Sequence, residues 1–233
     1  LGEDSVLIYH CNAYLSKGFN YRTLEDIKDT FKNSSDKIAW INNFVNELHT
    51  TFANLKKLEH LDDPNLNNLR YLGMPAFAYP FIIKGVKILR NDNLKLTKLF
   101  RLLEIVAFRQ ALLAKRADLI SRLNNALVNF DGNLISLRKR LITNTADYWN
   151  EYEVRWELDH NMYGNRVLNY VLWRYEVSLQ GPGYKVGSYY IEKEQIEHIS
   201  PQTSSGVASG YQVNSAGEYE DDYRYSYVEK IGN

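Results

Sequence analysis

The sequence predicts a mainly α-helical protein, with a multi-helix domain over residues 1–180 and a small strand-containing element over residues 181–233. Two observations support this fold class. In several segments of the first 180 residues, apolar side chains recur every three or four positions, which is the period of an amphipathic helix. After Gln180 a Gly-Pro-Gly sequence and a Ser/Gly-rich segment replace that pattern. We therefore place a domain boundary near residue 181.

The longest predicted helix begins near Ser34, a suitable N-cap, and ends before the Asp-Asp-Pro sequence at residues 62–64. We expect one stripe of this helix to pack against a core. The stripe comprises Ile38, Ile41, Val45, Leu48, Phe52 and Leu55. A shorter helix precedes it from Thr23 through Phe31, with Thr23 and Asp26 at the spacing of a capping box.

The most hydrophobic predicted helix runs from Leu94 to Arg116 and leaves only a narrow polar strip, so we expect it at the centre of the bundle. Further helices are predicted at residues 134–142 and 163–179. Beyond the boundary, residues 189–191 and 195–199 are typical of strands. Residues 203–217 indicate a mobile loop, and residues 221–231 another short helix.

The composition excludes several classes of protein. There are 28 basic and 28 acidic residues, so the chain is neither globally basic, as many nucleic-acid-binding proteins are, nor dominated by an acidic tail. No segment approaches the roughly 18 uncharged apolar residues of a membrane span. The acidic start does not fit a signal peptide, and the first residue is not methionine, so we expect a piece of a longer, cytoplasmic protein. The single cysteine, Cys11, excludes an internal disulfide and a Cys-based zinc site, and we expect it to be buried.

Charge is unevenly distributed along the chain. Residues 84–142 contain 13 basic and 4 acidic residues, whereas residues 143–233 contain 7 basic and 14 acidic ones. The densest basic clusters are Lys115-Arg116 and Arg138-Lys139-Arg140, which could follow a DNA phosphate backbone. Alternatively, they are solvated helix faces whose charge offsets the acidic C-terminal part. The sequence leaves both interpretations open.

Of the five histidines, His198 has the most suggestive surroundings. His10, His49 and His60 lie in helical patterns and are expected to be structural or exposed, and His160 follows Asp159 in a predicted loop. His198 ends a predicted strand directly after Glu197. An imidazole with an ordinary pKa near 6.5 can take a proton from water at neutral pH, and a neighbouring carboxylate can bind a hard divalent cation.

The sequence Glu197-His198-Ile199-Ser200-Pro201-Gln202 resembles the first motif of the HNH, or His-Me finger, nucleases. The wider order of segments is similar to the C-terminal half of the GmrSD-type modification-dependent restriction endonucleases and related phage-defence nickases. It comprises a helical region, a Leu-x-Tyr-x-Leu-x-Arg-Tyr-Glu helix at residues 168–176, the histidine motif, a variable loop and a helix that ends in Ile-Gly-Asn. The resemblance covers most of the chain loosely and residues 168–233 more tightly. It implies that residues 181–233 form an incomplete ββα-metal element.

The resemblance also implies a role for three residues. His198 would be the general base that activates water against a DNA phosphodiester, Glu197 would help to hold Mg²⁺ or another divalent metal, and Asn233 would brace the histidine loop. In this family an N-terminal nucleotide-hydrolysing domain precedes the helical part, and the substrate is modified foreign DNA. The implied enzyme is therefore a metal-dependent DNA endonuclease or nickase.

Two departures from the family's pattern indicate a fragment of such an enzyme. The third motif, a histidine or asparagine on the following helix, has no counterpart before the last residue, and the Asp-Gly-Gln-Gln-Arg motif of the N-terminal domain is absent. A site that lacks one ligand should bind Mg²⁺ weakly, so the fragment is expected to have little activity alone. An alternative function is a non-catalytic helical interaction module with a vestigial HNH loop, and a non-nuclease enzyme built around His198 is a third.

Overall fold

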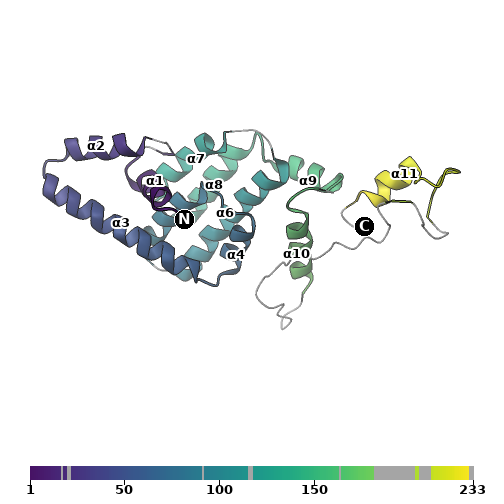
Figure 1. The fold of residues 1–233 in the computed structure, drawn as a ribbon, viewed down its shortest axis with the longest axis horizontal. Coiled ribbons are helices and arrows are strands. Elements are labelled where there is room, and N and C mark those ends of the chain that lie inside the picture. Colours follow the sequence, from purple (N-terminus) through teal and green to yellow (C-terminus); the bar gives the residue numbers. More distant parts are fainter. Residues whose placement is uncertain are drawn as a thin grey trace. The chain divides into compact units, whose positions relative to one another are not determined.

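The computed structural model describes residues 1–16, 18–19, 22–90, 92–114, 118–162, 164–180, 203–204 and 211–230. These residues are mainly α-helical, which confirms the predicted class (Figure 1). The chain divides into two compact units, one of residues 1–107 and 115–148, the other of residues 108–114 and 149–233. The strands predicted at residues 189–191 and 195–199 lie outside the described residues, so the ββα element and the boundary near residue 181 stay predictions.

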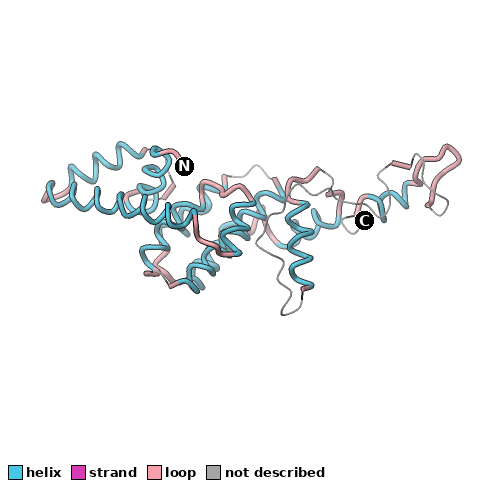
Figure 2. Tube along the Cα trace, turned by 60° about the horizontal axis from the view of Figure 1, so that its bottom comes forward, coloured by secondary structure: helices cyan, strands magenta, loops and turns pink. Residues whose placement is uncertain are grey.

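The first unit is a layered set of helices. They are α1 (Glu3–Tyr14), α2 (Thr23–Asn33), α3 (Lys37–Glu59), α4 (Pro64–Tyr71), α5 (Ala78–Ile88), α6 (Asn93–Leu113) as far as residue 107, α7 (Leu119–Val128) and α8 (Leu134–Thr145). Helix α1 packs against α2, α3 and α5, and α7 packs against α8. Figure 2 shows α2 and α3 side by side as a hairpin.

The second unit contains the last turns of α6, α9 (Glu151–Asp159), α10 (Leu168–Leu179), the short α11 (Asp221–Tyr223) and the π-helical turn η1 (Arg224–Val228). Arg109 donates to the backbone oxygen of Trp149 at 2.6 Å and pairs with Glu151 at 2.9 Å. The Asn165 side chain donates to the backbone oxygen of Leu112 at 3.1 Å. These contacts fix the start of α9 and the approach to α10 against the end of α6.

Side-chain caps explain where several helices begin, and they correct two sequence predictions. Asp36, rather than Ser34, caps α3 by accepting from the backbone N–H of Ala39 at 2.9 Å. Asp63 caps α4 and accepts from two backbone N–H groups, in agreement with the predicted stop at the Asp-Asp-Pro sequence. The predicted capping box of Thr23 is wrong, because Thr23 is already the first helical residue and α2 has no side-chain cap.

Helix α6 occupies the centre of the first unit's core, as its hydrophobicity predicts. Leu99, Phe100 and Leu103 are fully buried. Helix α5 approaches this face at Gly85, where an added Cβ would lie 2.3 Å from Cδ2 of Leu99. Such a distance is far below van der Waals contact, so glycine is what allows α5 and α6 to pack this closely.

A buried carboxylate also lies on α6. The Glu104 side chain is fully buried, accepts from Nδ2 of Asn68 at 3.1 Å and pairs with Arg101 at 2.8 Å. A buried carboxylate that loses its hydrogen-bond and ion-pair partners is left as an uncompensated charge, which is destabilising. These contacts therefore connect α4 to α6 at one defined position.

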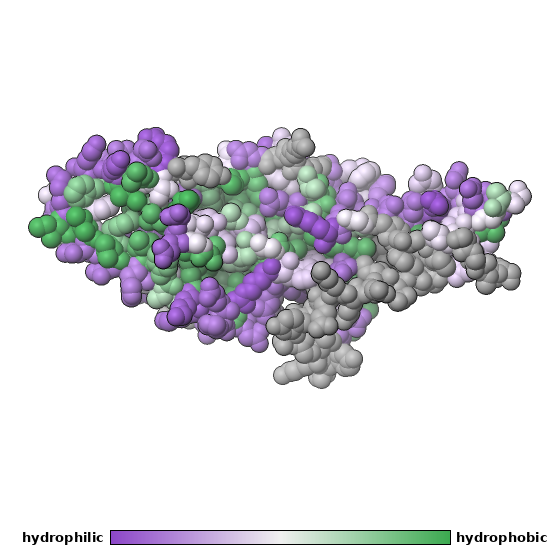
Figure 3. Space-filling model, viewed as in Figure 1, coloured by the Kyte–Doolittle hydropathy of each residue, from purple (hydrophilic) through white to green (hydrophobic). Residues whose placement is uncertain are grey.

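The prediction that the apolar stripe of α3 packs against a core is wrong for most of its length. Ile38, Ile41, Val45 and Phe52 are exposed, and only Leu55 at the far end is buried. Figure 3 shows hydrophobic side chains on the surface over the α2–α3 hairpin. The side of α3 that is packed carries Trp40, Phe44 and Thr51 instead, so the apolar side chains cover more of this helix than its core contacts require.

The segment predicted as a mobile loop is partly ordered. Val213 and Tyr219 form an isolated antiparallel bridge around a turn in which Gly217 has a φ of +78°. The Asn214 side chain accepts from the backbone N–H groups of Ala216 and Glu218. The rings of Tyr211, Tyr219, Tyr223 and Tyr227 contact one another with centroids 5.2–6.5 Å apart. The helix predicted at residues 221–231 corresponds to α11 and η1.

Among the described residues, three other than glycine adopt a left-handed backbone, and each follows the end of a helix. They are Met74 after α4, Arg90 after α5 and Ala114 after α6, with φ of +43°, +50° and +45°. A Cβ makes this conformation cost about 1 kcal/mol or more, so glycine or asparagine is the usual residue there.

We predict that Gly85→Ala lowers the free energy of unfolding by about 1–3 kcal/mol, because its Cβ would push Leu99 away. Chemical denaturation measures this change. The matched control is a double-mutant cycle with Leu99→Ala, in which the truncated side chain makes room for the new methyl group. The double variant should lose clearly less stability than the sum of the single variants, and strict additivity would contradict the proposed close contact.

Candidate functional site

The structure describes only some of the sequence-predicted site residues. His198, Glu197 and Asn233 lie outside the described residues, as do Lys115 and Arg116. The cluster of Arg138, Lys139 and Arg140 is described and lies on α8. The nuclease motif itself is therefore not placed in three dimensions, whereas the candidate nucleic-acid contact on α8 is.

Helix α8 exposes a mixed basic and apolar stripe. Its N-terminus is capped by Asn133, which accepts from the backbone N–H groups of Ile135 and Ser136, and its inner face buries Leu137 and Leu141. The outer face carries Ile135, Arg138, Lys139 and Ile142, at spacings that place all four on one side of a helix. Ile135 is 84% exposed and Ile142 is 56% exposed.

Arg140 stabilises the fold through a backbone contact and is not part of this exposed stripe. It donates to the backbone oxygen of Asn129 at 3.0 Å, and Lys84 donates to those of Leu127 and Val128 at 2.8 and 3.0 Å. These oxygens belong to the C-terminal end of α7, where carbonyl groups lack helical partners. Burial lowers the pKa of Lys84, while the carboxylate of Asp131 acts in the opposite direction. Lys84 and Arg140, two cations of the basic segment, thus stabilise the turn between α7 and α8.

Other cations of the basic segment are occupied by carboxylates. The pairs in the first unit are Lys87–Glu47 at 2.5 Å, Lys95–Asp92 at 3.1 Å, Arg101–Glu104 at 2.8 Å and Arg122–Asp147 at 3.3 Å. Arg138 and Lys139 are exposed, and no carboxylate of the described residues pairs with them. The basic side chains that remain available to bind phosphate are therefore fewer than the composition indicates.

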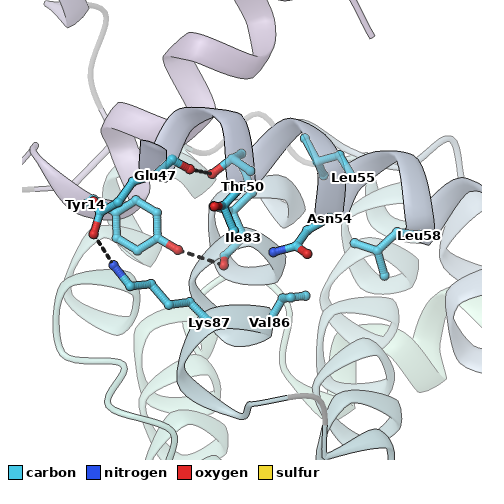
Figure 4. A pocket seen from close by; sticks show the side chains of 10 residues that line it. Tyr14, Glu47, Thr50, Asn54, Leu55, Leu58, Ile83, Val86 and Lys87 are labelled. Atoms are coloured by element: carbon cyan, nitrogen blue, oxygen red, sulfur yellow. Dashed lines mark hydrogen bonds and ion pairs between the residues drawn. The ribbon is translucent and has the colours of Figure 1, made fainter. Parts of the chain in front are cut away.

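A small cavity of about 150 Å³ lies between α1, α3 and α5 (Figure 4). Tyr14 lines it and donates its hydroxyl to the backbone oxygen of Ile83 at 3.0 Å. Lys87 lies over the Tyr14 ring at 4.7 Å and pairs with Glu47 at the rim. Ligand pockets usually measure about 300–1,000 Å³, so this cavity has the size of a packing defect with a polar edge.

His10 and Cys11, on α1, are both fully buried. Nδ1 of His10 lies 2.9 Å from Oγ1 of Thr51, and the ring meets Tyr14 and Phe44 edge-on. Burial lowers the pKa of His10 to about 4 and raises that of the Cys11 thiol to about 12. Both groups are thus neutral and enclosed at neutral pH, which confirms the structural role expected for His10 and the burial expected for Cys11.

A second cavity, of about 430 Å³, lies within the second unit. It is lined by Trp156, Glu157, His160, Asn161, Tyr225, Glu229 and Lys230. The His160 ring stacks on Trp156 at 3.9 Å, and its Nδ1 lies 2.5 Å from the Trp156 backbone oxygen. Asp159 is held by Lys230 instead, at 3.4 Å. The Asp159-His160 sequence therefore does not form a carboxylate–imidazole pair here.

The sequence analysis did not single out Trp156 and Tyr225, which line this cavity. The high density of aromatic residues in the second unit is the sequence feature that could have pointed to them. Among the described residues, no group of three or more His, Cys, Asp or Glu side chains is arranged to hold a metal ion. The carboxylate of Glu197, which lies outside the described residues, is chemically suited to bind a hard divalent cation.

Comparison with known proteins gives no assignment: no family model, no curated protein and no solved structure matches this chain. Within the described part of the chain, every helix is too short or too polar to cross a membrane.

We predict that His10 makes stability depend on pH. Its pKa is about 4 in the folded chain and 6.5 as the ordinary value, so the unfolded chain binds more protons between these pH values. Stability should be complete above pH 6.5 and fall as the pH is lowered toward 4.

The measurement is the free energy of unfolding across this range for the wild type and for His10→Asn. The variant should be less stable at neutral pH and should show a shallower pH dependence, because Glu47, Lys87 and all other groups titrate in both proteins. His49→Asn, on the exposed side of α3, is the control and should keep the wild-type slope. Identical slopes for wild type and His10→Asn would contradict the assignment.

Proposed function

We propose that this chain is part of a metal-dependent DNA endonuclease or nickase of the HNH type, acting in a bacterial restriction or phage-defence system. The observation that carries the proposal is the sequence Ile196-Glu197-His198-Ile199-Ser200-Pro201-Gln202 downstream of a helix at residues 168–179. The mainly helical character of the described residues is consistent with a helical region that precedes the nuclease motif.

In this proposal His198 is the general base. Its neutral imidazole takes a proton from water while the water oxygen bonds to the phosphorus of a DNA phosphodiester. The bond between phosphorus and the leaving sugar oxygen breaks, and that oxygen takes a proton from solvent. Asn233 braces the histidine loop. Glu197 would hold Mg²⁺, which supplies stabilisation of the negative charge that develops on the phosphoryl oxygens.

The α8 stripe would provide part of the DNA contact. Arg138 and Lys139 project from a helix whose own packing is complete, and the described residues do not neutralise their charge. Contacts of this kind are independent of base sequence and weaken as salt is added. Recognition of modified foreign DNA, and the nucleotide hydrolysis that would drive it, would come from an N-terminal domain of the same protein in the cytoplasm.

A second candidate function is a helical interaction module in which the HNH motif is vestigial. The observation that favours it is the large amount of apolar side chain exposed on α3 and α8 of the first unit. The two candidates differ in one property, namely whether His198 is required for DNA cleavage.

We predict that His198→Ala abolishes Mg²⁺-dependent nicking or cleavage of plasmid DNA by the longer protein that contains this chain. Agarose-gel conversion of supercoiled plasmid measures the activity, and binding of the same DNA should be retained. His60→Asn, an exposed histidine directly after α3, is the matched control and should cleave normally. Cleavage by His198→Ala at the wild-type rate would favour the interaction module.

We predict that the double variant Arg138→Gln/Lys139→Gln binds duplex DNA more weakly. If each side chain neutralises one phosphate, the slope of log K against log salt should fall by about 2. Fluorescence anisotropy at several salt concentrations measures it. Lys28→Gln/Lys32→Gln removes the same two charges from the exposed side of α2 and should leave the slope unchanged. Equal effects of both double variants would remove α8 from the interface.

A further inference from the structure

The cavity of about 430 Å³ in the second unit is lined by the C-terminal end of α9 and by the π-helical turn η1. Its volume is within the range of about 300–1,000 Å³ that is usual for small-molecule sites. The cavity of about 150 Å³ in the first unit is below that range. The larger cavity therefore has room for a small ligand, and the side chains that line it determine which kind.

Two helical turns each contribute a pair of side chains to this cavity. Trp156 and His160 are four residues apart at the end of α9, so they lie on one side of the helix. In η1 the backbone N–H of Glu229 donates to the backbone oxygen of Arg224 at 3.0 Å, which is the hydrogen bond of a π-helix. Tyr225 and Glu229 both line the cavity from this turn. Single π-helical turns are rare and occur frequently at functional sites.

The cavity presents two exposed aromatic rings, those of Trp156 and Tyr225, which are 48% and 65% exposed. The ring of His160 stacks on Trp156 at 3.9 Å. Nδ1 of His160 donates to the backbone oxygen of Trp156 at 2.5 Å, since a carbonyl oxygen can only accept. The stacking restricts the rotation of the indole at the edge of the cavity. The face of an aromatic ring carries negative electrostatic potential, which attracts cations.

The charged side chains at the cavity include two carboxylates without a cationic partner. Glu157 and Glu229 line the cavity, and no Lys or Arg of the described residues forms an ion pair with either. Glu157 accepts only a long hydrogen bond from the Asn165 amide, at 3.5 Å. Lys230 also lines the cavity, but its ammonium group binds the carboxylate and the backbone oxygen of Asp159. The lining therefore favours a positively charged ligand.

The end of α9 adds to this negative potential. The last carbonyl groups of a helix carry the negative end of its dipole, which favours a cation. The contact of Lys230 with the backbone oxygen of Asp159 shows that an ammonium group is accepted at this helix end. The same last turn lines the cavity through Trp156 and Glu157. The backbone and the side chains thus favour the same sign of charge in a ligand.

The lining favours an organic cation over a metal ion or a phosphate. A hard metal ion needs several oxygen ligands, and the described residues contain no group of three or more His, Cys, Asp or Glu side chains that could hold one. Anions would be repelled by Glu157 and Glu229. Aromatic rings bind quaternary ammonium groups, because the charge of such a group is spread over apolar methyl groups that can contact the rings.

We propose that this cavity binds a quaternary ammonium group. The rings of Trp156 and Tyr225 contact its methyl groups, and the carboxylates of Glu157 and Glu229 balance its charge. The group belongs either to a free amine such as choline or to a trimethylated lysine side chain, and the chemistry that the cavity recognises is the same in both. The proposal goes beyond the nuclease function and does not depend on it.

The first test compares ligands of the same shape, using the 233-residue chain. Choline carries a trimethylammonium group, and its neutral carbon analogue carries a tert-butyl group in that place. Choline should bind with a Kd below about 1 mM, and the neutral analogue at least about tenfold more weakly. N-acetyl-trimethyllysine amide is titrated in parallel, and the tighter of the two cations identifies the source of the group. Ligand-observed NMR at about pH 8.5, above the ordinary pKa of an imidazole, measures all three.

Substitutions in the lining have matched controls on the same segment. Tyr225→Leu removes a ring and should weaken binding of the cation about tenfold, whereas Tyr225→Phe keeps the ring face and should retain binding. Tyr227→Leu removes a ring of η1 that is 60% exposed but does not line the cavity, and it should bind like the wild type. Glu229→Gln should weaken binding, and Glu218→Gln, at an exposed carboxylate outside the cavity, should not. Circular dichroism checks that each variant stays folded.

Three results would overturn the proposal. One is that neither cation binds at concentrations up to about 10 mM. Another is that the neutral analogue binds as tightly as choline, which would show an apolar pocket without preference for charge. The third is that Tyr225→Leu and Glu229→Gln both bind the cation like the wild type, which would place its binding elsewhere on the chain.

Discussion

The close approach of α5 to α6 is the packing constraint on which the first unit depends. Gly85 lets the backbone of α5 come into contact with Leu99, and this contact completes a core in which one face of α6 is fully buried. Helix α4 is then held to the same helix through Asn68 and the buried carboxylate of Glu104. The exposed apolar side of α3 and the outer face of α8 take no part in this core.

The structure separates cations that hold the fold from cations that are available to a ligand. Lys84 and Arg140 satisfy carbonyl groups at the end of α7, and five other cations of the basic segment have carboxylate partners, so they contribute little to an external field. Arg138 and Lys139, which lie beside two exposed isoleucines on α8, are among the exposed cations that have no carboxylate partner in the described part of the chain.

Sequence reasoning succeeded where a pattern has one physical meaning and failed where it has several. The long apolar run of α6 can only be buried, and it is. The three-and-four spacing of apolar residues in α3 predicts that this face contacts another surface, but it does not indicate whether that surface belongs to the same chain. Helix α5 is not among the helices that the sequence predicts, and its Pro80 lies in the first turn, where proline is tolerated. The sequence also could not show that Arg140 binds a backbone carbonyl group whereas Arg138 stays exposed, because this depends on which carbonyl groups lie nearby in the fold.

The left-handed residues at three helix ends have a practical consequence for handling this molecule. Met74, Arg90 and Ala114 each carry a Cβ in a backbone conformation that favours glycine or asparagine. Replacing them would relieve strain of roughly 1 kcal/mol per site without touching α8 or the exposed side of α3. Substitutions at these three positions should therefore give a more thermostable protein for crystallisation or calorimetry.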